Sequence, residues 1–375
     1  MPCCWRRLFT DASIVKAVAL ILDRPFGSDP EPAVHALDMA LIMAGAPGEG
    51  RRAAIGRLLQ ALDDRRDDCC PDDARSPAAK RLKLDPSSST PLPARPDDQQ
   101  VRWPVPRRDR MSLEAFQRHL DGQNTPVVIA GALEHWPALG PQRAWASPAY
   151  LLSRTHGGRR LVPVELGRAY TDPAWRQAII PFRVFLATHI LAAAAGAGPA
   201  SATTATGYLA QHNLFSQVPA LRDDIAIPDY CYATPPSRPP TAAELPPLDE
   251  PAINAWFGPR GTISPLHTDP HANILAQVVG SKYVRLYAPD QTARVFPRGV
   301  DPDTAVDMAN TSRAEVEAAD GCGGEALGAD EKREWAQARY VDTVLQPGEA
   351  LYIPAGWWHY VRSLDVSFSV SFWWD

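Results

Sequence analysis

The sequence lacks a long apolar run, a cleavable leader and an excess of positive charge. Its longest early apolar run, "SIVKAVALIL", is interrupted by Lys16 and is far shorter than the ~20 residues of a membrane-spanning helix. No small-residue cleavage site follows this run, so we expect neither a signal peptide nor a membrane partner. The net charge of −5 argues against direct binding of nucleic acid, which requires an excess of Lys and Arg.

Cysteine is scarce, and its six residues form no CxxC motif. Four of them fall in the adjacent pairs Cys3-Cys4 and Cys69-Cys70, whose members are poor disulfide partners for each other. We therefore predict a reduced, intracellular protein. No repeat with a fixed period is visible, which argues against a solenoid or propeller.

Proline is abundant instead, with 38 residues concentrated outside the apolar segments, and this distribution indicates a linker. Residues 1–67 contain three segments with helical spacing of apolar residues and form a predicted helical N-terminal region. Residues 68–110 have too little apolar surface to fold and form a predicted disordered linker. Residues 111–375 form one block and are predicted to be the main domain.

A short basic segment, "PAAKRLKLD", occupies residues 77–85 within that linker. Lys80, Arg81 and Lys83 would offer an exposed basic strip, as a monopartite nuclear-import signal does to an importin. The predicted location is the nucleus, with the cytoplasm as a second compartment. The alternative is a chance basic patch in a solvated linker.

Strand signals dominate the chain after Ala252, with Gly and Pro turns between them. Many short strands of this kind indicate a sandwich or barrel, so the predicted fold is mainly β with helices. Gly280-Ser281 is predicted to be a two-residue hairpin turn between two of the strands. An acidic insertion over residues 301–339 has no strand character and is expected to be helix and loop. The predicted strands are 125–131, 158–167, 252–258, 263–269, 272–280, 282–289, 350–356, 358–364 and 366–374.

The stretch "HTDPHAN" suggests a metal site, because residues at positions i and i+2 of a strand point to the same face. His267 and Asp269 have this spacing, and two histidines with one carboxylate form the facial ligand set of mononuclear non-haem iron(II). His359, at the start of a late strand, is the best third ligand. His271 is its rival, although Pro270 interrupts the strand before it. Each histidine alone would more often be a packed or hydrogen-bonded residue.

Two further features suit a ligand-binding barrel. Lys282 is placed to form a charge-assisted bond with the far carboxylate of a dicarboxylate cosubstrate, although an exposed turn lysine is the ordinary alternative. The C-terminal strand "VSFSVSFWW" alternates a bulky apolar face with a face of three serines and Trp373. Such a strand suits a barrel wall that leaves room for a ligand, and the alternative is a half-buried strand whose serines lie in water.

Three longer segments are informative as a set: "INAWFGPRGTISPLHTDPHANILAQVVGSKYVRLYAP", "PGEALYIPAGWWHYVRSLDVSFSVSFWW" and "GYLAQHNLFSQVPALRDDIAIPDYC". They closely resemble the JmjC-domain-containing protein 5 type of jumonji-C (JmjC) oxygenase, from about Trp103 onward and only weakly in the helical region before it. The resemblance implies a double-stranded β-helix (cupin-like) barrel that binds Fe(II) and uses 2-oxoglutarate and O2 as cosubstrates.

The same resemblance implies roles for individual residues. His267, Asp269 and His359 correspond to the catalytic iron ligands of this family. Other positions match residues around 2-oxoglutarate or in the substrate pocket, where an acidic group beside an aromatic wall suits a guanidinium or ammonium group. The positions around 2-oxoglutarate are Tyr208, Ser264, Asn273, Lys282 and Trp373, and those in the substrate pocket are Glu165 and Trp175.

The function expected from the resemblance is oxidation of a basic side chain in a nuclear protein. Hydroxylation of an arginine carbon is favoured, because Glu165 and Trp175 suit a guanidinium. The first alternative is demethylation of methyl-lysine in a histone, as a chromatin regulator. The second is a non-catalytic nuclear scaffold that binds partners through its N-terminal helices, and an intact ligand set argues against it.

Overall fold

The computed structural model describes residues 2–23, 29–67, 92, 99–172, 174–194, 206–236, 245–300, 305–317 and 327–375. The import-like motif at 77–85 lies outside the described residues, as do most of the linker and residues 318–326 of the acidic insertion. None of the helices in the described part combines the length and the apolar character needed to cross a membrane.

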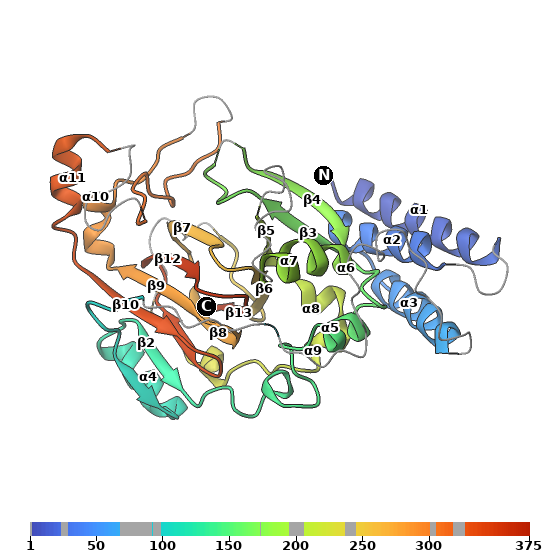
Figure 1. Ribbon diagram of the computed structural model, residues 1–375, viewed down its shortest axis with the longest axis horizontal. Coiled ribbons are helices and arrows are strands. Elements are labelled where there is room, and N and C mark those ends of the chain that lie inside the picture. The colour runs from blue at the N-terminus through green and yellow to red at the C-terminus, as the bar shows by residue number, and fades with distance from the viewer. Residues whose placement is uncertain are drawn as a thin grey trace.

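Two β-sheets form the body of the molecule (Figure 1). The smaller sheet has the order β10 (Tyr340–Leu345), β9 (Lys282–Tyr287), β12 (Trp358–Ser363) and β7 (Ile263–Thr268), all antiparallel. The larger sheet has the order β1 (Arg107–Asp109), β2 (Val127–Ala130), β11 (Ala350–Ile353), β8 (Ala272–Val279), β13 (Ser367–Trp374), β6 (Ala252–Gly258), β5 (Gly207–His212), β3 (Leu161–Leu166) and β4 (Arg176–Pro181).

An apolar layer fills the space between the two sheets. It contains residues from both, such as Leu275 and Leu351 of the larger sheet and Val284 and Val361 of the smaller one. From β6 onward, strands that follow one another along the chain, such as β7 and β8, belong to different sheets, with β9 and β10 as the exception. This alternation is the arrangement of a double-stranded β-helix and confirms the predicted cupin-like barrel.

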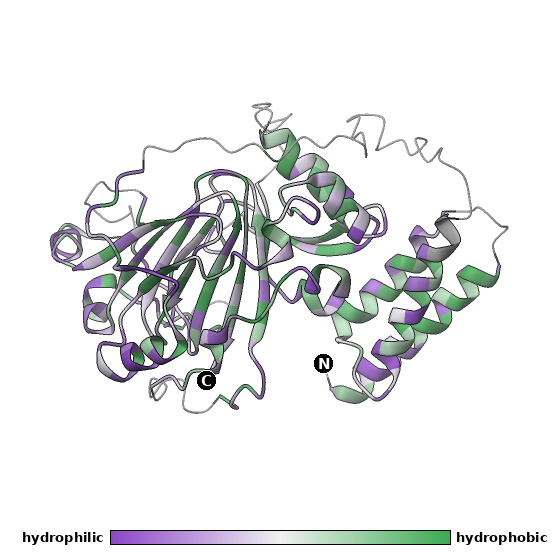
Figure 2. Ribbon diagram, turned by 90° about the horizontal axis from the view of Figure 1, so that it is seen from below, coloured by the Kyte–Doolittle hydropathy of each residue, from purple (hydrophilic) through white to green (hydrophobic). Residues whose placement is uncertain are grey.

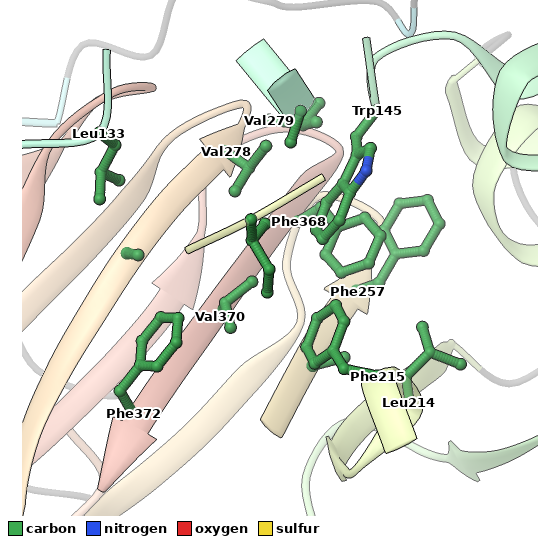
Figure 3. Close-up of a cluster of buried hydrophobic side chains, with 14 of the residues drawn as sticks. Leu133, Trp145, Leu214, Phe215, Phe257, Val278, Val279, Phe368, Val370 and Phe372 are labelled. Atoms are coloured by element: carbon green, nitrogen blue, oxygen red, sulfur yellow. The ribbon is translucent and has the colours of Figure 1, made fainter. Parts of the chain in front are cut away.

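A second and larger core lies on the other face of the larger sheet, where helices and loops cover it (Figure 3). The rings of Phe257 and Phe368 stack with their centroids 4.6 Å apart, and Trp145 lies 4.5 Å from Phe368. Most of the covering segments are short: α4 (Leu113–Gly122), η2 (Pro137–Leu139), α5 (Pro148–Arg154), α6 (Phe182–Phe185), η3 (Leu186–Leu191), α7 (Ala192–Ala194), α8 (Leu214–Gln217), α9 (Pro219–Arg222) and η4 (Asp229–Tyr232).

The two faces of β13 are both buried. Its bulky residues, such as Phe368 and Phe372, belong to the outer core. Its serines are at most 1% exposed, and Ser369 donates a hydrogen bond to Gln277 at 2.7 Å. The alternative interpretation, in which these serines lie in water, is therefore wrong, because the small face of the strand points into the barrel.

Gly280-Ser281 is not a hairpin turn, which corrects the sequence-based expectation. β8 pairs with β11 and β13, whereas β9 pairs with β10 and β12, so the two residues form a corner between the sheets. Gly280 has φ +63°, and a Cβ there would lie 2.1 Å from the Val366 carbonyl oxygen. The Ser281 N–H donates to Asp365 Oδ1 at 2.7 Å and fixes the corner. The local sequence is typical of a hairpin turn, but tertiary contacts determine the direction of the chain between β8 and β9.

Residues 99–110 are also not linker, which corrects the predicted boundary at residue 110. β1 pairs in parallel with β2, and Val105 is 2% exposed in the layer between the sheets. The Trp103 N–H donates to the buried carboxylate of Asp342 at 2.7 Å. A distant carboxylate and a distant strand edge therefore order a segment that has little apolar surface of its own.

The N-terminal region folds as predicted into helices that pack together beside the barrel (Figures 1 and 2). These are α1 (Cys3–Leu22), α2 (Glu31–Met39) with its continuation η1 (Ala40–Ala44), and α3 (Arg51–Asp67). Their shared core is small and alanine-rich. At the opposite end of the molecule, the acidic insertion contains α11 (Ala329–Trp335), and η6 (Pro289–Gln291) and α10 (Thr292–Val295) precede it in the chain.

Candidate metal centre and adjoining pocket

His267, Asp269 and His359 form the group that is suited to a metal ion in the described part of the chain, with their ligand atoms within 4.8 Å of one another. His267 on β7 lies directly opposite His359 on β12 in the antiparallel register, and their ring centroids are 4.2 Å apart. Asp269 follows the end of β7, with its carboxylate 3.5 Å from His359 Nε2 and 3.8 Å from His267 Nε2. The sequence therefore identified the three residues that the fold brings together.

Hydrogen bonds to the backbone orient both imidazoles. The Nδ1 atom of His267 lies 2.7 Å from the Pro265 carbonyl, and that of His359 lies 3.0 Å from the Trp357 carbonyl. A carbonyl oxygen can only accept a hydrogen bond, so Nδ1 of each imidazole is the donor and carries the hydrogen. In a neutral imidazole Nε2 is then left with a lone pair. Both lone pairs then face the Asp269 carboxylate. Together the two Nε2 atoms and the carboxylate form the set of ligand atoms that a divalent metal requires.

The protonation states also fit a metal. Burial, followed by repulsion from His359, lowers the pKa of His267 to about 4, so this imidazole is neutral at pH 7. Burial alone would raise the pKa of Asp269, but its interactions with His359 and His267 outweigh this effect and keep the pKa below its usual value. Two imidazole Nε2 atoms and one carboxylate thus face the same point, and they fit Fe(II).

His271 does not belong to this group. Its Nδ1 lies 2.8 Å from Asp375 Oδ1, and its ring stacks on Trp373 with a centroid distance of 6.1 Å. The strand ends before Pro270, so the side chain turns toward the C-terminal strand instead of the ligand pair. Of the two histidines considered as the third ligand, the geometry favours His359.

A buried cation lies next to the metal-binding group. Lys282, at the start of β9, is 1% exposed and donates a hydrogen bond from Nζ to the Tyr208 hydroxyl at 3.2 Å. Among the described residues Lys282 has no carboxylate partner in an ion pair, and burial lowers its pKa to about 7. The alternative of an exposed turn lysine is therefore wrong. Burial also raises the pKa of Tyr208, which the neighbouring Ser264 hydroxyl partly offsets.

Two buried polar atoms without partners lie on neighbouring strands of the larger sheet. Asn273 on β8 and Trp373 on β13 face each other in register. The Asn273 Oδ1 and the Trp373 indole N–H are both buried and have no hydrogen-bond partner within the described structure. Since buried polar groups nearly always have a partner, these two atoms indicate a place for a polar ligand.

A second carboxylate, Glu165, lies at the end of β3, where Trp175 closes over it. Gly167 follows with φ +141°, and a Cβ there would lie 3.3 Å from the Trp175 Cα. Burial raises the pKa of Glu165, and the Trp175 indole N–H partly offsets the shift without forming a well-directed hydrogen bond. Among the described residues no cation forms an ion pair with this carboxylate.

Tyr170 connects the two acidic sites and was not recognised from the sequence. Its pKa is raised mainly by burial and further by the charges of Asp269 and Glu165, so it stands near both carboxylates. Its hydroxyl lies 3.4 Å from Thr311 Oγ1 in the acidic insertion. Both residues lie in loops without a regular pattern, so no local signal marked either one.

Comparisons with known proteins agree with this geometry. The model of a family described as "Cupin-like domain" matches residues 113–375. The chain is 38% identical over 374 residues to "Lysine-specific demethylase 8" of Danio rerio, covering 99% of this chain and 81% of the relative. It is 42% identical over 271 residues to "Lysine-specific demethylase 8" of Xenopus tropicalis and 39% identical over 271 residues to "Jumonji C domain-containing protein 5" of Drosophila melanogaster.

The two shorter alignments cover 72% of this chain but only 53% and 60% of those relatives, which are longer proteins. The likeness to the Danio rerio protein extends through the N-terminal helices, where the sequence alone indicated only a weak resemblance.

Proposed function

Since the chain belongs to the cupin-like JmjC family of Fe(II)- and 2-oxoglutarate-dependent oxygenases, we propose that it oxidises a basic side chain of a protein. The observation that carries this proposal is the position of a second, half-buried carboxylate, Glu165, which pairs in register with Tyr208 beside Lys282.

The Tyr170 hydroxyl lies 3.4 Å from Thr311 Oγ1, and Thr311 forms a backbone bridge with His267. Since the charges of Glu165 and Asp269 both act on Tyr170, a side chain paired with Glu165 would extend toward the metal-binding group.

The metal centre supplies the oxidation. With Fe(II), 2-oxoglutarate and O2 bound, it would convert a substrate C–H bond to C–OH while 2-oxoglutarate becomes succinate and CO2. His267, Asp269 and His359 would hold the metal on one side and leave the other positions free. The surrounding protein supplies orientation and excludes water.

Lys282 and Tyr208 would hold the far carboxylate of 2-oxoglutarate. The ammonium group is buried with no acidic partner in the described part of the chain, and the Tyr208 hydroxyl is already beside it. A buried cation of this kind is costly unless an anion pairs with it. Ser264 lies beside Tyr208, and the unpartnered atoms of Asn273 and Trp373 would contact the rest of the cosubstrate.

Glu165 and Trp175 would recognise the basic side chain of the substrate. A carboxylate gains most from a donor with two parallel N–H groups, which a guanidinium provides and a trimethylated ammonium cannot. The indole of Trp175 would add an aromatic wall for the cation.

Two outcomes of the oxidation have separate support. The names of the relatives favour demethylation, in which hydroxylation of an N-methyl group of lysine releases formaldehyde. The bidentate capacity of Glu165 favours hydroxylation of an arginine carbon, with histones or other basic proteins as partners in either case. Mass spectrometry of arginine and mono-, di- and trimethyl-lysine peptides, incubated with enzyme, Fe(II) and 2-oxoglutarate, distinguishes a gained oxygen from a lost methyl group.

The same incubation tests the alternative of a non-catalytic scaffold. Succinate release that requires Fe(II), 2-oxoglutarate and a basic peptide supports the oxygenase. Its absence with every peptide, from protein that binds both the metal and 2-oxoglutarate, would support the scaffold.

Glu165→Gln is expected to lower kcat/KM for a basic peptide by about ten- to a hundredfold, because the neutral amide loses a charged hydrogen bond. Steady-state kinetics with varied peptide measures this effect. The affinity for 2-oxoglutarate should stay unchanged, since Glu165 does not contact Lys282. A matched control is Glu134→Gln, which removes the charge of a carboxylate in an exposed ion pair with Arg110. Equal loss in both variants would contradict the substrate role of Glu165.

We also propose that residues 77–85 direct the protein into the nucleus through an importin. Replacing Lys80, Arg81 and Lys83 by alanine removes the basic strip that an importin groove would bind. Fluorescence microscopy of the tagged full chain is expected to show loss of nuclear accumulation. Unchanged nuclear accumulation would mean that the segment is only a chance basic patch.

A further inference from the structure

One buried carboxylate joins the N-terminal helices to the barrel. Asp38 lies on α2 and is fully buried, and its oxygens accept hydrogen bonds from Arg160 Nε at 2.9 Å and Nη2 at 2.7 Å. Arg160 belongs to the barrel domain and is only 3% exposed. The α2 helix runs alongside β3 and α6 in Figure 1, and α2 and β3 are in contact.

Asp38 also holds the backbone of the barrel itself. The Leu161 N–H, at the first residue of β3, donates to Asp38 Oδ2 at 2.7 Å. Gln217 donates from Nε2 to both Asp38 Oδ1 and the Leu161 carbonyl, each at 2.8 Å. The Gln217 Oε1 lies 2.6 Å from His212 Nε2, at the last residue of β5. The Asp38 network therefore contacts the start of β3 and the end of β5.

These two strands carry residues of the proposed pocket. Glu165 lies on β3 four positions after Leu161, and it pairs in register with Tyr208 on β5. Tyr208 in turn accepts the hydrogen bond of Lys282. A change in the position of β3 at Leu161 would thus move the Glu165 carboxylate and the Tyr208 hydroxyl together.

Another ion pair between α2 and the barrel, Glu31 with Arg183, does not reach the strands of the pocket. Glu31, also on α2, accepts two hydrogen bonds from Arg183 Nη2 at 2.6 and 2.8 Å, but Arg183 lies in α6 and the contact involves side chains only. Tight attachment alone does not need a buried charge, because apolar residues of similar volume often stabilise a contact equally well.

We propose that Asp38 is a positioning residue that sets the geometry of the 2-oxoglutarate and substrate pocket, so that the N-terminal helices are a working part of the enzyme. This inference rests on the proposed function in so far as Tyr208 binds 2-oxoglutarate. The metal-binding group lies on and after β7 and on β12, in the smaller sheet, and does not depend on β3 or β5. Asp38 should therefore affect cosubstrate and substrate binding but not metal binding.

The test compares three variants of the full chain by calorimetry. Asp38→Asn removes the charge, and the double variant Asp38→Leu with Arg160→Met replaces the ion pair by apolar groups and keeps the helices docked. Glu31→Gln is the matched control on the same helix. We expect Asp38→Asn and the double variant to raise the dissociation constant of 2-oxoglutarate for the Mn²⁺-loaded protein about fivefold, as for a loss of ~1 kcal/mol. The Mn²⁺ affinity should be unchanged in all three.

A purely structural role would give a lower melting temperature with unchanged 2-oxoglutarate affinity at 25 °C, and this result would overturn the proposal. A change as large in Glu31→Gln would also overturn it. If the variants do not fold, hydrogen exchange on the unaltered protein tests the proposal instead. Coupling between the 2-oxoglutarate pocket and the Asp38 network is reciprocal, so ligand binding should affect the network. Binding of 2-oxoglutarate is then expected to slow exchange of the Leu161 amide at least threefold, and no change would contradict the proposal.

These measurements need no turnover. A protein that binds Mn²⁺ and 2-oxoglutarate as expected but oxidises no peptide would refute the proposed function and leave the role of Asp38 testable.

Discussion

His359→Ala is expected to lower metal affinity by more than about a hundredfold and to abolish turnover, because even partners that only hydrogen-bond to a metal ligand are worth ten- to a hundredfold. The same result is expected for His267→Ala, whose imidazole faces His359 across the β7–β12 pair. Calorimetric titration of the metal-free protein with Mn²⁺, followed by succinate release with Fe(II), measures both effects.

His271→Ala is the control for this prediction. His271 is bonded to Asp375 and stacked on Trp373, so its loss removes neither a ligand atom nor the charge of Asp269. Metal affinity should stay within about threefold of the unaltered protein, a change of less than ~1 kcal/mol. Loss of metal binding in His271→Ala, with retention in His359→Ala, would reverse the assignment of the third ligand.

Lys282→Met is expected to raise the dissociation constant of 2-oxoglutarate about a hundredfold or more, because removing one partner of a buried charge pair costs ~2–5 kcal/mol. Methionine fills much of the same volume, so the variant should fold. Its free energy of unfolding at pH 7 should be equal or higher, since the unliganded protein no longer buries an ammonium group without an acidic partner. Calorimetry on the Mn²⁺-loaded protein measures the affinity, and Mn²⁺ binding itself should not change.

The pH dependence gives an independent check on Lys282. Burial lowers its pKa from 10.5 to about 7, so binding of the 2-oxoglutarate dianion above pH 7 requires uptake of a proton. Affinity should fall as the pH rises from about 7 to 9, and Lys282→Met should lack this part of the dependence. Between about 7 and 10.5 the unfolded chain binds the extra proton, so this group makes the unliganded protein more stable as the pH increases. A flat affinity profile in the unaltered protein would contradict the role of Lys282.

The sequence was informative where a local pattern and the fold agree. The i and i+2 spacing of His267 and Asp269, and the strand signals around His359, were enough to assemble the metal-binding group. The alternating C-terminal strand became a barrel wall with both faces buried. In each case the two-residue alternation of side chains along a strand made the prediction possible, and long-range pairing then brought the strands together.

Besides β1, which lies in the predicted linker, three strands were not predicted, and their sequences show why. β4, "RQAIIP", starts with exposed polar residues, and β5, "GYLAQH", is short and partly exposed. β10, "YVDTVL", contains Asp342 in its centre, which reads as a turn residue. In the fold that carboxylate is 1% exposed and accepts hydrogen bonds from the backbone of residues 102 and 103, which orders the segment before β1.

The role of Asp38 could not be predicted for a similar reason. An aspartate on a helix and two arginines before a strand are typical of a solvated surface. Only the fold shows that one of those arginines, Arg160, is buried against Asp38. Interactions between residues 122 positions apart leave no periodic trace in a single sequence.

The placement of the metal-binding residues and of the proposed substrate residue in different sheets has an evolutionary consequence. The metal-binding residues lie in the smaller sheet or directly after β7, whereas Glu165 lies in the larger sheet, on β3, next to the edge strand β4. Under the proposed substrate role of Glu165, substitutions around this residue would alter target choice while the metal-binding group stays intact. A lineage with this architecture would then exchange one protein target for another without passing through an inactive ancestor.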